Sequence, residues 1–293
     1  MAPLACLLQE QGHRVRGTDG PLYPPMSTLL ERAGIHPHVG YDAAHLDPRP
    51  DLVIIGNAIR RDNVEAVEAE RLGLPILSMP QALARFFLSR HRPLVVAGTH
   101  GKTTTTAMAA WVYTACGADP GYLIGGAPQD LPGSFHDGAG ERFVIEGDEY
   151  NAAYFDRGAK FLHYQPETLV LTSVEYDHAD LYPNPETLWE AYAKLIRSLP
   201  ESGLLVACGD SPKVRELSLL ARCRTLFYGL DPENAVHPVG EIESLPEASR
   251  LRVADPEAGE VEITLSMAGS HNVANALAVW AAARRDGLPA AAV

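Results

Sequence analysis

The chain has 293 residues, enough for two domains with separate cores, and its 24 Lys and Arg residues against 37 Asp and Glu residues give a net charge of -13. This balance argues against nucleic acid as a partner, because phosphate backbones are bound by clustered cations. The sequence has no apolar run of about 18 residues, which argues against membrane insertion, and its four scattered cysteines fit reduced thiols, so we expect a cytoplasmic protein.

Residues 1–90 predict an α/β domain that lacks its usual beginning. The chain starts with an amphipathic helix over 4–11 and a short strand over 14–17, whereas a doubly wound fold begins with a strand and a glycine-rich phosphate-binding turn. We therefore expect a Rossmann-like domain that is truncated at its start. Its further predicted elements are helices over 26–33, 64–72 and 80–88 and strands over 51–56 and 75–78.

A polar turn follows the predicted strand over 51–56 and contains Asn57 and Asn63. Loops at the carboxyl ends of parallel strands are where such folds bind ligands, so both side chains are candidate ligand contacts. A solvated turn without a ligand explains the same residues equally well.

A basic connection over 90–93 is the predicted boundary between a first domain, 1–90, and a second one, 91–293. The second domain opens with an apolar, β-branched strand over 94–97, a loop that reads G-T-H-G-K-T, and a helix over 104–115. Strand, glycine loop and helix in this order form a phosphate cradle. The loop and the helix start present backbone N–H groups and the positive end of the helix dipole.

Lys102 and Thr103 provide the side chains that such a cradle requires. Lys102 supplies a mobile cation for phosphate, and the Thr103 hydroxyl is placed to bind Mg²⁺ held by the same phosphates. The general motif has four residues between its glycines, whereas here only two separate Gly98 from Gly101. An ordinary glycine turn with a chance Lys-Thr pair is the alternative.

Acidic residues follow two later strands of this domain. A strand over 142–145 runs into the string E-G-D-E, which starts at Glu146, and a strand over 168–173 is followed by an acidic segment that contains His178. Parallel strands align their carboxyl ends, so we expect these groups beside the glycine loop, where carboxylates and an imidazole suit a magnesium and nucleotide site. A charged solvated loop and a hydrogen-bonded surface histidine are the alternatives.

The remaining elements predict a mainly parallel sheet. At the start of the last helix, His271, Asn272 and Asn275 are expected either to cap the helix or to hydrogen-bond a base edge, and capping is the simpler interpretation for any one of them. The predicted elements are helices over 185–199, 214–222 and 273–285, strands over 121–126, 204–208 and 224–229, and a hairpin over 253–267.

Four strings in this order resemble the Mur ligases, the cytoplasmic ATP-dependent enzymes that form amide bonds in peptidoglycan synthesis. They are A-G-T-H-G-K-T-T-T (97–105), E-G-D-E (146–149), D-H-A-D (177–180) and H-N-V-A-N (271–275). The resemblance implies an α/β fold with a truncated Rossmann-like domain for a UDP-sugar, followed by a P-loop central domain that binds ATP on a mainly parallel sheet. The shortened glycine loop is a feature of this family.

Further segments are most similar to the branch of the family that recycles muropeptides. They are Y-P-P-M-S-T-L-L-E (23–31), D-L-V-I-I-G-N-A (51–58), E-Y-N-A-A-Y-F-D-R (149–157) and K-F-L-H-Y-Q-P-E-T-L (160–169). This likeness implies an ATP-dependent ligase that joins UDP-N-acetylmuramate to the tripeptide L-alanyl-γ-D-glutamyl-meso-diaminopimelate through an acyl phosphate. The alternatives are the ligase that adds L-alanine to UDP-N-acetylmuramate and, for this chain by itself, a non-catalytic module that binds Mg-ATP.

The resemblance also implies roles for individual residues. Lys102 would hold the β- and γ-phosphates, Thr103 and Glu146 would bind one Mg²⁺, and His178 would bind a second. The expected catalytic residues are therefore Lys102, Glu146 and His178. The expected UDP-sugar contacts are Asn57 and Asn63, and the expected ATP contacts are Gly98, Thr99, His100, Gly101, Lys102, Thr103, Thr104, His271, Asn272 and Asn275.

Members of the family carry a third, C-terminal domain that holds the amine, and the resemblance implies that this chain ends before it. We therefore expect the chain to be a fragment that is inactive as a ligase by itself. Gly147 stands where the family resemblance leads us to expect alanine, and we expect this difference to be tolerated.

Overall fold

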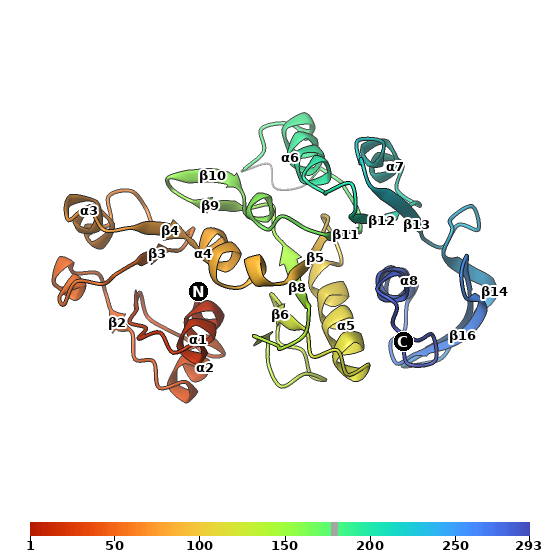
Figure 1. The fold of residues 1–293 in the computed structure, drawn as a ribbon, viewed down its shortest axis with the longest axis horizontal. Coiled ribbons are helices and arrows are strands. Elements are labelled where there is room, and N and C mark those ends of the chain that lie inside the picture. The colour runs from red at the N-terminus through yellow and green to blue at the C-terminus, as the bar shows by residue number, and fades with distance from the viewer. Residues whose placement is uncertain (177–180) are drawn as a thin grey trace. The chain divides into compact units, whose positions relative to one another are not determined.

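The computed structural model describes residues 1–176 and 181–293, and its internal contacts divide the chain into two compact units (Figure 1). Unit 1 comprises Met1–Arg90 and Tyr150–His163, and unit 2 comprises His91–Glu149 and Tyr164–Val293. The change of unit after Arg90 falls at the basic connection in the sequence. Residues 150–163 belong to unit 1, although the sequence analysis assigned them to the second domain.

Unit 1 contains short strands that pair two by two. β1 pairs with β2 and β3 with β4, both in parallel, and β9 and β10 form an antiparallel pair. The predicted strand over 14–17 is wrong, because a strand needs a partner in register and pairing with β2 begins at Thr18, opposite His38. The elements are α1 (Ala2–Glu10), β1 (Thr18–Asp19), α2 (Met26–Arg32), β2 (His38–Val39), η1 (Ala43–Leu46), β3 (Val53–Ile55), α3 (Val64–Arg71), β4 (Ile76–Ser78), α4 (Met79–Phe86), η2 (Leu88–Arg90), β9 (Asn151–Ala153), β10 (Asp156–Ala159) and η3 (Lys160–His163).

A seven-stranded sheet forms the centre of unit 2, with the strand order β13-β12-β11-β5-β8-β6-β7. Neighbouring strands run parallel, apart from β6 and β7. β5 lies between β11 and β8 and is buried from Pro93 to Ala97, as its apolar, β-branched sequence predicts for a central strand. The strands are β5 (Arg92–Ala97), β6 (Gly121–Leu123), β7 (Phe135–His136), β8 (Arg142–Gly147), β11 (Thr168–Leu171), β12 (Leu204–Cys208) and β13 (Arg224–Tyr228).

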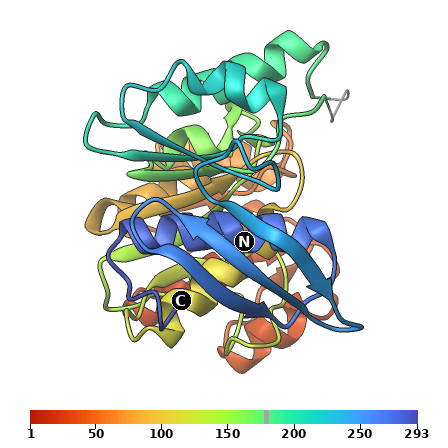
Figure 2. The same ribbon diagram turned by 90° about the vertical axis from the view of Figure 1, so that its right-hand side faces the viewer.

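Helices cover both faces of this sheet (Figures 1 and 2). α5 and α8 lie side by side on one face, and α6 and α7 lie together on the other. Apolar side chains of the strands, such as Val96 and Val144, form one core with Tyr113 of α5 and Trp280 of α8. The removal of these side chains from water holds α5 and α8 against this face of the sheet. The helices are α5 (Lys102–Ala115), α6 (Pro185–Arg197), α7 (Pro212–Ser218) and α8 (Ser270–Arg285).

A three-stranded antiparallel sheet, β14-β15-β16, packs on α8 (Figure 2). The predicted hairpin is confirmed, since Asp255 of β15 pairs with Gly259 of β16. β14 was not predicted from the sequence. The strands are β14 (His237–Ser244), β15 (Ser249–Asp255) and β16 (Gly259–Leu265).

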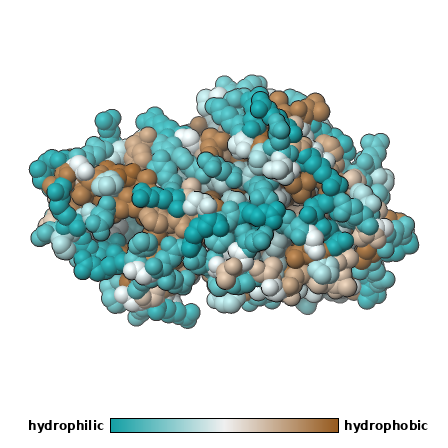
Figure 3. Space-filling model, viewed as in Figure 1, coloured by the Kyte–Doolittle hydropathy of each residue, from teal (hydrophilic) through white to brown (hydrophobic). Residues whose placement is uncertain are grey.

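Hydrophilic side chains cover most of the molecular face shown in Figure 3. In the described part of the chain, no helix has both the length and the apolar composition needed to cross a lipid bilayer. The four cysteines are free thiols, as the absence of paired spacing in the sequence predicts.

Candidate functional site

The carboxyl ends of β5, β8 and β11 lie level with one another at one edge of the sheet, which we call the carboxyl edge. Ala97, the last residue of β5, is in register with Gly147 of β8 and with Leu171 of β11. The parallel pairing therefore brings together the glycine loop 98–101, the acidic string that begins at Glu146, and the residues that follow β11. This confirms the expectation that these segments are neighbours.

Both glycines of the loop are required by its geometry. Gly98 and Gly101 have φ angles of 138° and 78°, in the region that favours glycine. A Cβ atom on Gly98 would lie 2.1 Å from Thr172 Oγ1, and one on Gly101 would lie 2.8 Å from Asn275 Oδ1. The loop therefore fits closely against the residue after β11 and against the first turns of α8, which leaves no room for larger residues.

The first half of the loop is fastened to the residues after β11. The N–H of Thr99 donates to the carbonyl of Ser173 at 2.9 Å, and the N–H of His100 donates to Ser173 Oγ at 3.1 Å. The hydroxyl of Thr172 donates to the carbonyl of His100 at 2.6 Å. The N–H groups of Thr99 and His100 are therefore already hydrogen-bonded to Ser173. The N–H groups at the start of α5, which have no partner within the helix by helix geometry, remain as donors for an anion.

Lys102 begins α5 and turns its side chain back over the loop. Its Nζ donates to the carbonyls of Gly98 and Thr99, at 2.7 and 3.4 Å, and to Glu149 Oε1 at 3.1 Å. The side chains of Lys102 and Glu149 are 14% and 1% exposed. Tyr182 donates its hydroxyl to the carbonyl of Glu149 at 2.6 Å, which fixes the backbone of that residue. The loop thus carries a nearly buried cation above the helix N-terminus.

Thr103 and Glu146 offer oxygen atoms beside this cation. Thr103 Oγ1 donates to both carboxylate oxygens of Glu146, at 2.9 and 3.0 Å, and the N–H of Gly125 donates to Glu146 Oε2 at 3.1 Å. A hydroxyl and a carboxylate are hard donors of the kind that Mg²⁺ takes from proteins, together with phosphate and water oxygens. The two residues therefore fit a magnesium ion that accompanies a phosphate. Among the described residues, no group of three or more His, Cys, Asp and Glu side chains forms a metal site.

The carboxylates of the acidic string create a negative electrostatic field at this edge. Together with burial, this field raises the pKa values of two neighbouring tyrosines. Burial raises the pKa of Tyr164 well above its ordinary value, and the charges of Asp148 and Glu146 raise it further. Burial, followed by the charges of Glu149 and Asp148, raises the pKa of Tyr182 to about 12. Such a field opposes the loss of a proton and favours the binding of cations. It is therefore consistent with a divalent ion at Thr103 and Glu146.

The start of α8 contributes to the same edge, but its side chains do not cap the helix. The N-cap position is occupied by Gly269, which has no side chain, so the capping interpretation of His271, Asn272 and Asn275 is wrong. Asn272 instead donates its amide to the carbonyl of Ala268 at 2.8 Å. Asn275 is 8% exposed and faces Gly101, whereas His271 is exposed. Of the three residues, Asn275 thus lies against the glycine loop.

The other sequence candidates fall elsewhere. Asn57 and Asn63 belong to unit 1, where Asn57 is exposed and Asn63 caps α3 by accepting the N–H groups of Glu65 and Ala66 at 3.0 and 3.3 Å. A helix cap accounts for Asn63 without a ligand. His178 lies outside the described residues, so its expected role as a metal ligand stays a prediction.

Sequence reasoning missed three residues that shape the site: Glu149, Thr172 and Ser173. Glu149 was noted as one of the acidic residues after β8, but its place in the sequence does not indicate that it, and not Glu146, contacts Lys102. Thr172 and Ser173 are the residues that follow β11, and the expected alignment of strand ends was the signal that could have found them.

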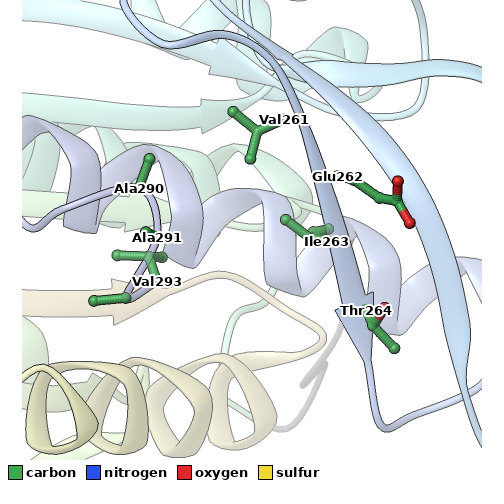
Figure 4. A pocket seen from close by; sticks show the side chains of 8 residues that line it. Val261, Glu262, Ile263, Thr264, Ala290, Ala291 and Val293 are labelled. Carbon is green, nitrogen blue, oxygen red and sulfur yellow. The ribbon is translucent and has the colours of Figure 1, made fainter.

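A groove in unit 2 lies away from this edge (Figure 4). Ala290, Ala291 and Val293 face the outer strand β16 across it. Among its described lining residues, Glu262 carries the charge, and a carboxylate repels phosphate. The groove is thus a poor candidate for an anion site. Its lining residues are Val261, Glu262, Ile263, Thr264, Ala290, Ala291, Ala292 and Val293.

Together, the sheet, the glycine loop and the oxygen donors define an α/β protein of the P-loop class. The chain belongs to the Mur ligase family. Residues 96–283 match the Mur ligase middle domain, and residues 1–91 match the Mur ligase family, catalytic domain. The fold predicted from the sequence is confirmed.

Two curated relatives and one solved structure place the chain within this family. It is 41% identical to an Escherichia coli K12 protein named UDP-N-acetylmuramate–L-alanyl-γ-D-glutamyl-meso-2,6-diaminoheptandioate ligase, over 98% of the chain and 62% of that protein. It is 36% identical to the UDP-N-acetylmuramate–L-alanine ligase of Rubrobacter xylanophilus, over 97% of the chain and 60% of that protein. The structure of the ligase of the first kind from Neisseria meningitides has a TM-score of 0.88 and 37% identity, covering 98% of this chain and 90% of that one. The chain thus spans about 60% of the length of the curated relatives.

Proposed function

We propose that the chain forms the nucleotide-binding and UDP-sugar-binding parts of an ATP-dependent ligase that joins UDP-N-acetylmuramate to L-alanyl-γ-D-glutamyl-meso-diaminopimelate. The observation that carries the proposal is the convergence of Lys102, Thr103 and Glu146 at the start of α5, beside N–H donors that suit phosphate. The name of the 41% identical relative supports the choice of substrates. Such an enzyme would act in peptidoglycan recycling in the cytoplasm, where the family acts.

Each group of the carboxyl edge has a role in this proposal. The N–H groups of the first turn of α5 and the ammonium of Lys102 would bind the β- and γ-phosphates of ATP. Thr103 and Glu146 would hold Mg²⁺, which neutralises charge on the phosphates when it is bound. Asn275 lies against the loop and would contact the nucleotide, and His178 would hold a second ion, as the resemblance to the family implies.

The proposed reaction has two stages. The muramyl carboxylate attacks the γ-phosphorus of ATP, so that ADP leaves and an acyl phosphate forms, and the amine then displaces phosphate to form the amide. Lys102 would stabilise negative charge on the transferred phosphoryl group, because its ammonium is held nearly buried, where charges interact strongly. The loop, fastened by Thr172 and Ser173, would keep that ammonium and the N–H donors in position.

Product detection tests the proposal. The complete ligase of which the chain is proposed to be a part is incubated with UDP-N-acetylmuramate, Mg-ATP and the tripeptide, and ADP and the UDP-linked muropeptide are followed by mass spectrometry. We expect both products in equal amounts, and neither with Lys102→Ala. ADP formation that is unchanged by Lys102→Ala would contradict the proposal. Tight binding of Mg-ATP without any ligation would favour a nucleotide-binding module.

A second candidate is the ligase that adds L-alanine to UDP-N-acetylmuramate. It is favoured by the 36% identity to the Rubrobacter protein of that name, over almost the whole chain. A competition assay separates the two, with the tripeptide and L-alanine present at equal concentration. We expect the tripeptide product to dominate, and a dominant L-alanine product would transfer the proposal to the second candidate.

A further inference from the structure

We propose that Glu149 holds Lys102 when no nucleotide is bound and releases it to the phosphates when one binds. Glu149 would be a positioning residue that acts through Lys102 and limits the affinity for the nucleotide. The inference rests on the proposed function, because it assumes that Lys102 contacts the β- and γ-phosphates.

The acceptors around Lys102 already match its capacity to donate. An ammonium has three N–H bonds, and Nζ has three acceptors: the carbonyls of Gly98 and Thr99 and the carboxylate of Glu149. A phosphate oxygen can therefore bond to Nζ only if one acceptor withdraws. The two carbonyls belong to a loop that is fastened to Ser173, whereas the carboxylate is the end of a rotatable side chain. Glu149 is thus the partner that the phosphate would displace.

Burial strengthens the electrostatic effect of the Glu149 carboxylate on its neighbours. The side chain is 1% exposed and that of Lys102 is 14% exposed, so water screens the pair weakly. Without nucleotide, the carboxylate compensates an ammonium that would otherwise be a nearly buried, unpaired cation. When phosphates arrive, the same carboxylate is a nearby negative charge that repels them. Both effects lower the affinity for the nucleotide below that of a site with a neutral residue at position 149.

The neighbouring carboxylate of Glu146 has different contacts and therefore a different role. It lies on β8, and its oxygens accept from Thr103 Oγ1 and from the N–H of Gly125. Glu149 follows the strand and contacts Lys102. Two acidic residues of one short string therefore serve two needs, with oxygen ligands for a metal ion at Glu146 and a temporary counterion for Lys102 at Glu149.

Nucleotide affinity of the Glu149→Gln variant tests the inference. The amide keeps the size of the side chain and an acceptor for Nζ but removes the charge. Titration calorimetry with Mg²⁺ and the non-hydrolysable analogue AMP-PNP is expected to give at least about tenfold tighter binding than in the wild-type chain, since the buried ammonium then lacks a charged partner. AMP, which has no β- or γ-phosphate, should gain nothing. Damage to the site by the substitution would instead weaken both ligands.

Glu141→Gln is the matched control, because it removes the same charge at the opposite end of β8, where the side chain is 81% exposed. Its affinity for AMP-PNP should equal that of the wild type. If Glu149→Gln does not fold, Glu149→Asp serves: it keeps the charge but shortens the side chain, and a smaller gain in affinity is expected. Equal or weaker binding of AMP-PNP by the Glu149 variant, with a wild-type chain that binds, would overturn the role of Glu149 alone. No binding by the wild-type chain would overturn the proposed function as well.

Discussion

The two ends of strands β5, β8 and β11 both carry buried ion pairs, but the pairs differ in kind. At the carboxyl edge, Lys102 pairs with Glu149. At the opposite end, which we call the amino edge, Arg142 of β8 pairs with Asp286, whose other oxygen accepts from the hydroxyl of Tyr113. Arg92 of β5 lies beside it and donates to Glu167, just before β11, at 2.8 Å.

The difference follows from strand direction and from the choice of cation. Helix α5 begins at the carboxyl edge and brings N–H donors there, whereas α8 ends near the amino edge and supplies Asp286. Arginine binds carboxylates through a fixed fork, but lysine is a point charge on a flexible stem that can change partners. The Arg142–Asp286 ion pair of the amino edge is therefore expected to stay closed. The Lys102–Glu149 ion pair of the carboxyl edge is the one that a ligand can open.

Lys102→Ala should have the largest effect of the variants considered, because it affects both nucleotide binding and stability. We expect at least about 100-fold weaker binding of Mg-AMP-PNP, which is about 2.7 kcal/mol, together with a loss of stability of about 3 kcal/mol, because the buried carboxylate of Glu149 loses its ion pair with Lys102. Calorimetry and urea denaturation measure the two effects. The double variant Lys102→Ala with Glu149→Gln should recover stability but not binding. Recovery of both would show that Lys102 does not contact the phosphates.

Arg142→Ala should affect stability alone. The side chains of Arg142 and Asp286 are 7% and 10% exposed, so removing one partner leaves a buried charge and should cost about 3–5 kcal/mol of unfolding free energy. Binding of AMP-PNP by the folded variant should be unchanged, because the Arg142–Asp286 ion pair lies at the other end of the strands. The exposed Glu141→Gln should cost less than about 0.5 kcal/mol. A loss of nucleotide affinity in Arg142→Ala would show that the edges are coupled.

Acid should weaken the interactions that hold the end of α8. The side chain of Asp255 is 0% exposed, and Asp255 accepts hydrogen bonds from Trp280 and Arg285 of α8 and from the N–H groups of Glu257 and Ala258. Burial alone would raise the pKa of this carboxyl, but the backbone hydrogen bonds and Arg285 outweigh burial, so the net shift of the pKa is downward.

A lowered pKa in the folded state stabilises the protein above the unfolded pKa, about 3.9, and this contribution is lost as the pH falls through the folded pKa. Asp255→Asn should therefore cost about 2 kcal/mol at pH 7, an amount typical of charged hydrogen bonds. The difference between the variant and the wild type should shrink below about pH 4. Urea denaturation from pH 3 to pH 7 measures it, and a difference that stays constant with pH would contradict this assignment.

Apart from the control Glu141→Gln, Gly147→Ala is expected to have the smallest effect, and it tests how closely the carboxyl edge is packed. A Cβ atom there would lie 2.8 Å from Val95 Cγ1 and 3.1 Å from the Cβ of Ala97, so the core must shift slightly. We expect a cost of about 1 kcal/mol in unfolding free energy, at the low end for overpacking, and little change in nucleotide affinity. Thermal denaturation measures the change in stability. Unchanged or increased stability would mean that the end of β8 accommodates the added methyl group without strain.

Structural features that depend on a single short segment could be predicted from the sequence. The apolar strand over 94–97, the loop between Gly98 and Gly101 and the helix that follows could be predicted, because hydrophobic pattern and glycine geometry act within a few residues. The neighbourhood of Glu146 followed from the alignment of parallel strands.

Features that depend on distant contacts could not be predicted in this way. The membership of residues 150–163 in unit 1 reflects contacts with segments far away in sequence. The pairing of Lys102 with Glu149, and not with Glu146, depends on side-chain positions that no spacing rule fixes. The capping error at α8 arose because polar residues at a helix start are often caps, whereas here Gly269 occupies that position.

The structure of the chain with Mg²⁺ and AMP-PNP bound would test the central claim most directly. We predict that the β- and γ-phosphates lie at the first turn of α5, that Lys102 Nζ contacts them, and that the contact between Lys102 and Glu149 is lengthened from 3.1 Å. A nucleotide bound elsewhere, with the contact between Lys102 and Glu149 intact, would contradict the account.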